Sequence, residues 1–150
     1  MDLKTSLMNL QCEMVAERTL VNPKNISWLQ YDILFQLMKE KNILPSKLSV
    51  ILGISRTKLS KALKSLKFSG YICQLPNQSD GRELCTSITE DGKRLIINIS
   101  ANHTALYQTA LKAFTQKEQE EFARLSEKLS SALNEERIAN YSENKGGIRP

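Results

Sequence analysis

The sequence predicts a mostly helical protein with one small β-hairpin, in which a helix–turn–helix is followed by a hairpin wing and flanked by further helices. Three observations support this fold class. Apolar residues recur at helical spacing in six segments of the chain. A glycine turn at Gly53 separates two short helical segments. Two strand-like runs, 71–75 and 84–88, are joined by a connection rich in turn-forming residues, 76–83.

The composition is that of an ordinary globular protein. Of 150 residues, 41% are hydrophobic and 25% are charged, and we expect one domain over 1–150. No apolar run approaches the ~20 residues that span a bilayer, and the N-terminus lacks the apolar stretch of a secretory signal. We therefore expect a cytoplasmic protein with no membrane partner. The three cysteines show no metal-ligand spacing and His103 is the single histidine, so we expect no metal, no cofactor and no disulfide framework.

Two amphipathic helices are expected before the glycine turn. In 3–21 an apolar stripe recurs at spacings of three, four and seven residues, and a break at 22–25 ends it. The segment 27–41 carries a broad apolar face that includes Trp28 and Tyr31, as expected of a central helix.

Two shorter helices meet at Gly53. Pro45 suits the first turn of a helix over 45–52, because its missing N–H is not needed there. Gly53 ends that helix in a position that tolerates positive φ, and Ser55 caps the next helix, which Gly70 ends. Four apolar residues share one face of this second helix: Leu59, Ala62, Leu63 and Leu66.

Helical patterns resume after the second strand. Apolar spacing predicts one long helix over 89–114. Thr115 and Glu118 have the form of a capping box, which begins a last helix that runs to about residue 139. The final segment, 141–150, has little apolar content and is expected to be disordered.

Positive charge is concentrated in 44–82. This segment holds seven Lys or Arg residues and one acid, Asp80, which gives it a net charge of +6. The whole chain carries +5, so the rest of the chain sums to −1. A local excess of cations on a helix–turn–helix pattern favours nucleic acid as the partner.

The helix that follows Ser55 has an apolar back and a polar front suited to the major groove of DNA. Short hydroxyl groups approach base edges closely, arginine donates two hydrogen bonds to guanine, and lysine mainly neutralises phosphate. Lys64 is expected to anchor phosphate, with Lys47 as a second candidate, and Lys58 and Lys67 are interpreted as solvated charge. The residues expected to read bases are Ser55, Arg56, Thr57, Ser60 and Lys61. A solvated lysine face on an ordinary surface helix is the alternative.

Asp80 and Arg82 lie in the turn-rich connection between the strands. An aspartate two residues before an arginine holds and aims it through a charge-assisted hydrogen bond. An aimed arginine at the tip of a narrow wing suits the minor groove, where negative potential is concentrated. We therefore predict that Asp80 and Arg82 take part in DNA binding. A plain surface ion pair is the alternative.

Five runs of residues carry a family resemblance. They are Leu48-x-x-x-Leu52-Gly53-Ile54-Ser55-Arg56, Leu59-Ser60, Leu66-x-x-x-Gly70-Tyr71-Ile72, Asp80-x-Arg82 and Ile88-Thr89-Glu90-Asp91-Gly92. In this combination, over about 28–96, the chain resembles the MarR family of winged-helix regulators. The resemblance implies a DNA-binding lobe at about 26–92, and a homodimer built by helices in about 1–22 and 93–140 that binds a palindromic operator. It also implies repression that a small ligand or cysteine oxidation relieves.

The sequence departs from the family pattern in and around the wing. Leu44 stands where a hydroxyl cap usually begins the first helix of the pair. Gln74 and Leu75 replace the usual basic pair on the first wing strand, and Gly81 replaces a common arginine. The wing is therefore expected to be less basic than is usual in the family. Phe68 lies off the apolar face of its helix and either packs under the wing or is exposed.

Candidates for sensing follow from the same resemblance, which places an effector between the dimer helices and the lobe. The candidate pocket residues are Met14, Trp28, Tyr31, His103 and Tyr107, with ordinary core packing as the alternative for each. Cys12 is the redox candidate, with Tyr31 as its partner from the next helix, and buried packing is its alternative. Cys73 and Cys85 lie on facing strands, where a bridge is not expected in a reducing cytoplasm.

Two other classes of function fit the sequence less well. A winged helix that binds a protein partner without binding DNA would favour an acidic recognition surface, and this one is basic. A thiol hydrolase using Cys12 or Cys85 with His103 would need a nucleophile motif, an acid pair or a Gly-rich loop, and the sequence has none. We therefore expect a sequence-specific DNA-binding transcription regulator, a homodimeric repressor, and no enzyme.

Overall fold

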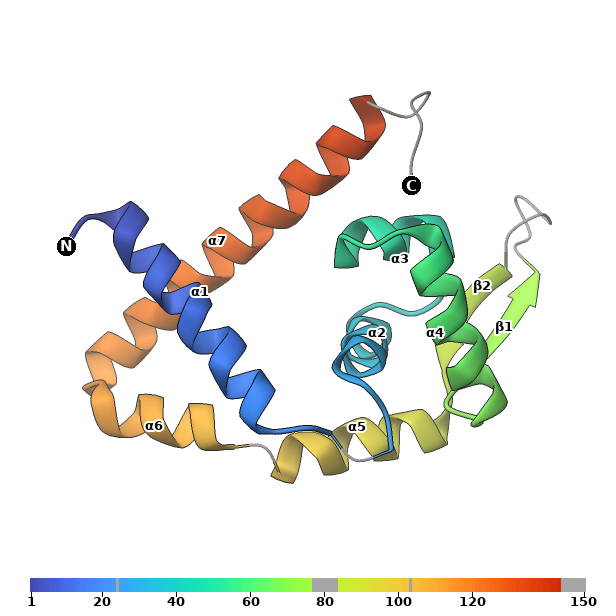
Figure 1. Cartoon of the computed structure of the whole chain (residues 1–150), viewed down its shortest axis with the longest axis horizontal. Coiled ribbons are helices and arrows are strands. Elements are labelled where there is room, and N and C mark those ends of the chain that lie inside the picture. The colour runs from blue at the N-terminus through green and yellow to red at the C-terminus, as the bar shows by residue number, and fades with distance from the viewer. Residues whose placement is uncertain (24, 77–83, 103, 144–150) are drawn as a thin grey trace.

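The computed structural model describes residues 1–23, 25–76, 84–102 and 104–143 (Figure 1). Within them the chain is mostly helical and carries a two-stranded antiparallel hairpin, which confirms the predicted fold class. The elements are α1 (Leu3–Leu20), α2 (Trp28–Lys39), α3 (Pro45–Leu52), α4 (Arg56–Phe68), β1 (Ile72–Pro76), β2 (Leu84–Ile88), α5 (Glu90–Asn102), α6 (Ala105–Ala113) and α7 (Gln116–Glu143).

The helices form two groups. Helices α2 to α5 and the hairpin pack together around one core, and α1, α6 and α7 extend from them on the other side (Figure 1). Helix α7 runs back toward the first group, and its C-terminal part packs against α3. None of the helices in the described ranges is both long enough and apolar enough to cross a bilayer.

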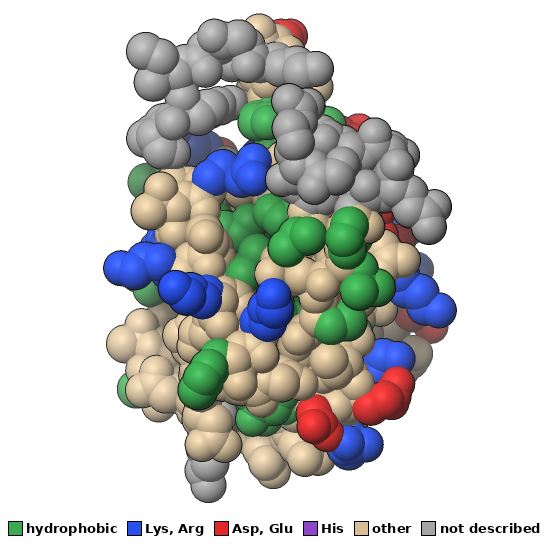
Figure 2. Space-filling model, turned by 90° about the vertical axis from the view of Figure 1, so that its right-hand side faces the viewer, with side chains coloured by type: hydrophobic (Ala, Val, Ile, Leu, Met, Phe, Trp, Pro, Cys, Tyr) green, Lys and Arg blue, Asp and Glu red, His purple; other side chains and the backbone are tan. Residues whose placement is uncertain are grey.

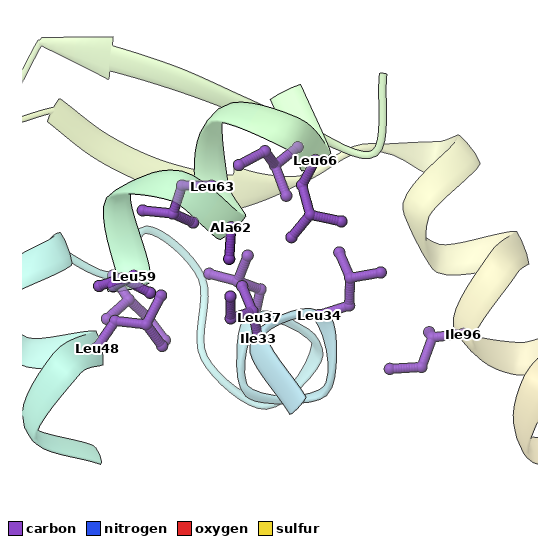
Figure 3. Packing of buried hydrophobic residues seen from close by; sticks show 11 residues of the cluster. Ile33, Leu34, Leu37, Leu48, Leu59, Ala62, Leu63, Leu66 and Ile96 are labelled. Atoms are coloured by element: carbon purple, nitrogen blue, oxygen red, sulfur yellow. The ribbon is translucent and has the colours of Figure 1, made fainter. Parts of the chain in front are cut away.

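The core is centred on the contact between α4 and α2. All four residues predicted on the apolar back of α4 are buried, and they face Ile33, Leu34 and Leu37 of α2 (Figure 3). Leu48 of α3 and Ile96 of α5 close the core at its sides. Burying one such leucine or isoleucine contributes about 1.5–3 kcal/mol relative to leaving it in water. This contact therefore determines which face of α4 is exposed.

The turn between α3 and α4 forms as the sequence predicts. Gly53 adopts the left-handed conformation, with φ 66° and ψ 36°, and its N–H donates to the carbonyls at the end of α3. Pro45 occupies the first turn of α3, and Leu44 stands at the N-cap position without a side-chain hydrogen bond. Leu44 therefore occupies the cap position where the sequence predicts it. The missing N–H of Pro45 leaves one donor fewer for a cap to satisfy.

The hairpin is tied to the core by an extra bridge. Its register pairs Ile72 with Ile88 and Pro76 with Leu84. Thr86 is fully buried and exchanges two backbone hydrogen bonds of 3.0 Å with Ile43, which precedes α3. A one-residue bridge produces no alternating pattern, so the sequence does not reveal it. It joins the base of the wing to the start of the helix–turn–helix.

Two predictions about the outer helices need correction. The helix expected over 89–114 is two helices, because α5 ends at Asn102 and α6 begins after Thr104. Asn and Thr are weak helix formers, and α6 buries no residue whose packing would hold a continuous helix across them. The sequence predicts disorder from residue 141, yet α7 continues to Glu143 because Tyr141 is half-buried beside the α3–α4 turn. Residues 144–150 lie outside the described ranges.

The start of α7 follows its predicted capping box. The N–H of Glu118 donates to Thr115 Oγ1 at 3.2 Å, and the N–H of Thr115 donates to Glu118 Oε1 at 2.9 Å. These hydrogen bonds lower the pKa of Glu118, chiefly through the backbone donor of Thr115. The box therefore marks a helix start that sequence reasoning located correctly.

The junction between the hairpin and α5 is tightly packed. Thr89 Oγ1 donates to the Gly70 carbonyl at 2.7 Å and accepts from the N–H of Gly92 at 3.1 Å. A Cβ on Gly92 would lie 2.2 Å from the Tyr71 carbonyl oxygen and 2.7 Å from Ile88 Cγ1. Only glycine fits this position without a shift of the backbone.

Substitution of Gly92 therefore tests this junction. Gly92→Ala is expected to lower the free energy of unfolding by about 1–3 kcal/mol, because the methyl group overlaps a backbone carbonyl that cannot rotate away. Urea denaturation followed by circular dichroism measures the change. Asn98→Ala, at an exposed position of the same helix, is the control and should change stability by less than ~0.5 kcal/mol. Equal stability of the two variants would contradict the close packing at Gly92.

Candidate nucleic-acid interface

Helix α4 presents a continuous polar front opposite its buried back. Most of the predicted contact residues are exposed on it: Arg56, Thr57, Ser60, Lys61 and Lys64. Figure 2 shows the side of the molecule that carries α4 and the hairpin, with Lys and Arg side chains spread across it. The prediction of an apolar back and a cationic front therefore matches the placement of these side chains.

Ser55 has a second role at the start of α4. It stands at the N-cap position, half-buried, and its Oγ accepts a hydrogen bond from the N–H of Lys58 at 3.2 Å. The hydroxyl hydrogen remains available to donate. The predicted cap is present, and any contact of Ser55 with DNA uses the same hydroxyl that holds the helix start.

A hollow of about 700 Å³ lies between the front of α4 and the hairpin; we call it the front hollow. Its floor includes Leu59 and Leu63, and its hairpin side includes Gln74 and Leu84. Four cationic side chains line it: Arg56, Lys61, Lys64 and Lys67. Among its described lining residues there is no Asp or Glu. The hollow is therefore suited to an anionic chain.

Lys67, interpreted from the sequence as solvated charge, lies in the front hollow. The signal was available in the sequence. Ser60, Lys64 and Lys67 are spaced by four and three residues, which puts them on one helix face. Lys58 does not line the hollow. Lys47 Nζ forms an ion pair with Glu40 Oε1 at 2.9 Å, so part of its charge is neutralised within the chain.

The described part of the wing is apolar on its outer side. Leu75 is 62% exposed, and Cys73 and Ser87 contact each other at 3.0 Å between Sγ and Oγ. Gln74 instead faces inward and donates to Thr86 Oγ1 at 3.2 Å. Phe68, whose placement the sequence left open, is 94% exposed. Asp80, Gly81 and Arg82 lie outside the described residues, so the predicted role of the wing tip stays a prediction.

Trp28 and Tyr31, two of the candidate pocket residues, lie in a packed cluster. Their rings meet edge to face with centroids 5.2 Å apart, and the Trp28 indole N–H donates to the carbonyls of Arg18 and Val21. The guanidinium of Arg18 lies over the Trp28 ring and forms two hydrogen bonds with Asp32, which raise the pKa of Arg18. This cluster joins α1 to α2.

The other pocket candidates are Met14, Tyr107 and His103. Met14 is half-buried on α1, Tyr107 is 62% exposed on α6, and His103 lies outside the described residues. Tyr31 Oη contacts Ser100 Oγ on α5 at 3.0 Å. The structure therefore brings Trp28 and Tyr31 together and leaves the proposed set as a whole a prediction.

The cysteines are free thiols. Cys12 is exposed on α1, which contradicts the alternative of buried packing. Cys73 pairs with Ser87 and Cys85 pairs with Leu75, so the two wing cysteines are offset diagonally on the hairpin. Among the described residues, no group of three or more His, Cys, Asp or Glu side chains is placed to hold a metal ion.

Comparison with known proteins places the chain in a family. Residues 24–83, which include the helix–turn–helix, match the model of the MarR family. The uncharacterized HTH-type transcriptional regulator YybA of Bacillus subtilis is 28% identical over 98 residues, which is 64% of each chain. The segment 24–83, with the helix–turn–helix, belongs to the MarR family. This is a family of winged-helix transcription regulators that bind DNA and are not enzymes.

Solved MarR family structures share the fold across nearly the whole chain. An uncharacterized SlyA-like transcription regulator from Listeria monocytogenes is 25% identical, with a TM-score of 0.74, and the match covers 96% of this chain and 97% of that one. A mutant of MarR from E. coli complexed with operator DNA is 22% identical, with a TM-score of 0.63, and the match covers 86% of this chain and 99% of that one. These matches confirm the winged helix with N- and C-terminal helices.

The cap at Ser55 can be tested apart from any DNA contact. Ser55→Ala is expected to lower the free energy of unfolding by about 0.5–2 kcal/mol, because the N–H of Lys58 loses its acceptor. Ser55→Asp restores an acceptor and should recover most of that loss. Ser65→Ala, at an exposed position inside α4, is the control and should be neutral or slightly stabilising. Thermal or urea unfolding of the DNA-free protein measures all three, and a neutral Ser55→Ala would show that the cap contributes nothing.

Proposed function

We propose that this chain is a sequence-specific regulator of transcription that binds double-stranded DNA through the front of α4. The observation that carries the proposal is the front hollow. Four cationic side chains line it, none of its described lining residues is an acid, and it lies along a helix that can enter a major groove. Ser55, Arg56, Thr57, Ser60 and Lys61 read bases, and Lys64 and Lys67 contact phosphates. Asp80 holds and aims Arg82, which contacts the minor groove.

Comparison with a solved complex supports this assignment. The E. coli MarR mutant that is complexed with operator DNA has the same fold as this chain. The protein-interaction alternative would leave the cations of the front hollow without a use. A winged helix that binds only proteins would show no salt-dependent affinity for DNA, and the experiment below separates the two.

We propose further that two copies form a symmetric homodimer through α1, α6 and α7. These three helices bury no residue within one chain. They expose apolar side chains that a folded protein normally covers, including Met8, Val15, Leu106, Phe122, Leu125, Leu129 and Leu133. A second copy would cover them in an isologous interface, and two-fold symmetry then requires inverted half-sites about one DNA turn apart.

The proposed mode of regulation is repression, with release by a small ligand. It rests on the resemblance to the MarR family and on the candidate pocket residues that this resemblance names, which are Met14, Trp28, Tyr31, His103 and Tyr107. The alternative signal is oxidation of Cys12, whose exposed thiol satisfies the need for access. Expression of a reporter under the selected operator, with and without the regulator and candidate ligands, tests the direction of control.

DNA binding is tested with an operator obtained by in vitro selection and a salt titration of its affinity. Lys64→Gln should weaken binding and reduce the slope of log K against log salt by about 1.8, since each of two protomers loses one phosphate contact. Lys112→Gln removes the same charge from α6, away from α4 in Figure 1, and should leave the slope unchanged. Salt-independent binding by the unmodified protein would sink the proposed function.

The dimer is tested by sedimentation at several concentrations. Leu129→Asp should weaken dimerisation by at least about tenfold, because each interface would bury a carboxylate without a partner. Ser131→Asp introduces the same charge on the same helix, half a turn away from the apolar stripe, and should leave the dimer intact. If Leu129→Asp and Ser131→Asp dimerised with equal affinity, the interface would lie elsewhere.

A further inference from the structure

A second hollow, of about 340 Å³, lies on the other side of the α4 N-terminus; we call it the flank hollow. Three parts of the chain line it: the end of α3 with Ser49 and Val50, the turn with Gly53 and Ile54, and the end of α7 with Arg137, Asn140 and Tyr141. Ser55 and Arg56 complete it at the start of α4. The family resemblance assigns α7 to the dimer and none of its residues to DNA.

Packing of α7 against α3 brings Arg137 to this position. Its Cδ atom lies 3.9 Å from where a Cβ would stand on Gly53, so its aliphatic stem covers the left-handed turn. Tyr141, one turn further along α7, is half-buried beside the same turn. The contact holds the arginine next to the start of the recognition helix although 81 residues separate Arg137 from Arg56.

The charge of the flank hollow is one-sided. Arg56 and Arg137 line it together, and its described lining contains no Asp or Glu. Two arginines on one hollow give it a positive potential that favours an anionic ligand. Arginine also presents a planar fork of N–H donors that matches the oxygens of a phosphate.

Arg56 lines both hollows, so the front hollow and the flank hollow meet at the α4 N-terminus. In a helix–turn–helix complex, that end of the recognition helix points into the major groove. The phosphate chains of the two strands border the groove on either side of it. The flank hollow lies at that end of α4 and is lined by none of the lysines of α4.

We propose that the flank hollow receives a backbone phosphate of the bound DNA and that Arg137 is a phosphate contact supplied by the C-terminal helix. This inference rests on the proposed DNA binding and adds a residue outside the helix–turn–helix and the wing. A free phosphate or a small carboxylate shares the same recognition chemistry. DNA is the better match because Arg56 lines both the flank hollow and the front hollow.

The test is a salt titration of operator affinity with three full-length variants. Arg137→Gln should weaken binding by about tenfold at low salt and reduce the slope of log K against log salt by about 1.8 for the dimer. Arg137→Lys keeps the point charge and should retain most of the slope. Lys128→Gln removes one charge from an exposed position of the same helix and is the matched control. Circular dichroism of each variant checks that α7 still folds.

The possible outcomes separate this inference from the proposed function. A wild-type protein that binds DNA with salt dependence, together with equal slopes for Arg137→Gln and Lys128→Gln, overturns only the inference. A wild-type protein that does not bind DNA overturns both. Calorimetric titration of the DNA-free protein with inorganic phosphate examines the other source of the anion. Phosphate binding that Arg137→Gln abolishes, with no change in the DNA slope, would assign the hollow to a free anion and overturn the DNA contact.

Discussion

The packing of the apolar back of α4 against α2 is the interaction on which the rest of the structure depends. Leu59, Ala62, Leu63 and Leu66 are buried against Ile33, Leu34 and Leu37, and this burial fixes the rotation of α4 about its axis. A shift of one residue along the helix would rotate the exposed face by about 100°, which follows from 3.6 residues per turn. The cations that line the front hollow face outward only because this contact holds them there.

A second constraint comes from the outer helices. Helices α1, α6 and α7 together make up a large part of the chain, yet none of their residues is buried within it. The lobe has a core of its own, whereas these helices need another surface to cover their apolar side chains. Helix α7 also packs against α3 beside the α4 N-terminus. Helix α7 thus belongs both to the proposed dimer interface and to the flank of the proposed DNA surface. A change in the dimer interface can therefore affect the DNA surface through this helix.

Positive charge is distributed unequally between the described wing strands and the recognition helix. Gln74 bonds inward to Thr86 and Leu75 is exposed, so the described strands offer no cation to DNA. The cations are instead concentrated on α4, with Arg137 added from α7. Under the proposed function, more of the phosphate contact is made around the recognition helix and less along the wing strands. Such a shift would make affinity depend strongly on the position of α7.

Local sequence signals determined most of the elements and only part of the site. Gly53, the cap at Ser55, the box at Thr115 and the periodic apolar back of α4 act within one or two turns, so the sequence reveals them directly. The break after Asn102 was missed because apolar spacing continued across it. Tertiary structure alone decided the Ile43–Thr86 bridge and the approach of Arg137 to Gly53. These depend on contacts between residues distant in the chain, and no local pattern of residue types records which distant segments will meet.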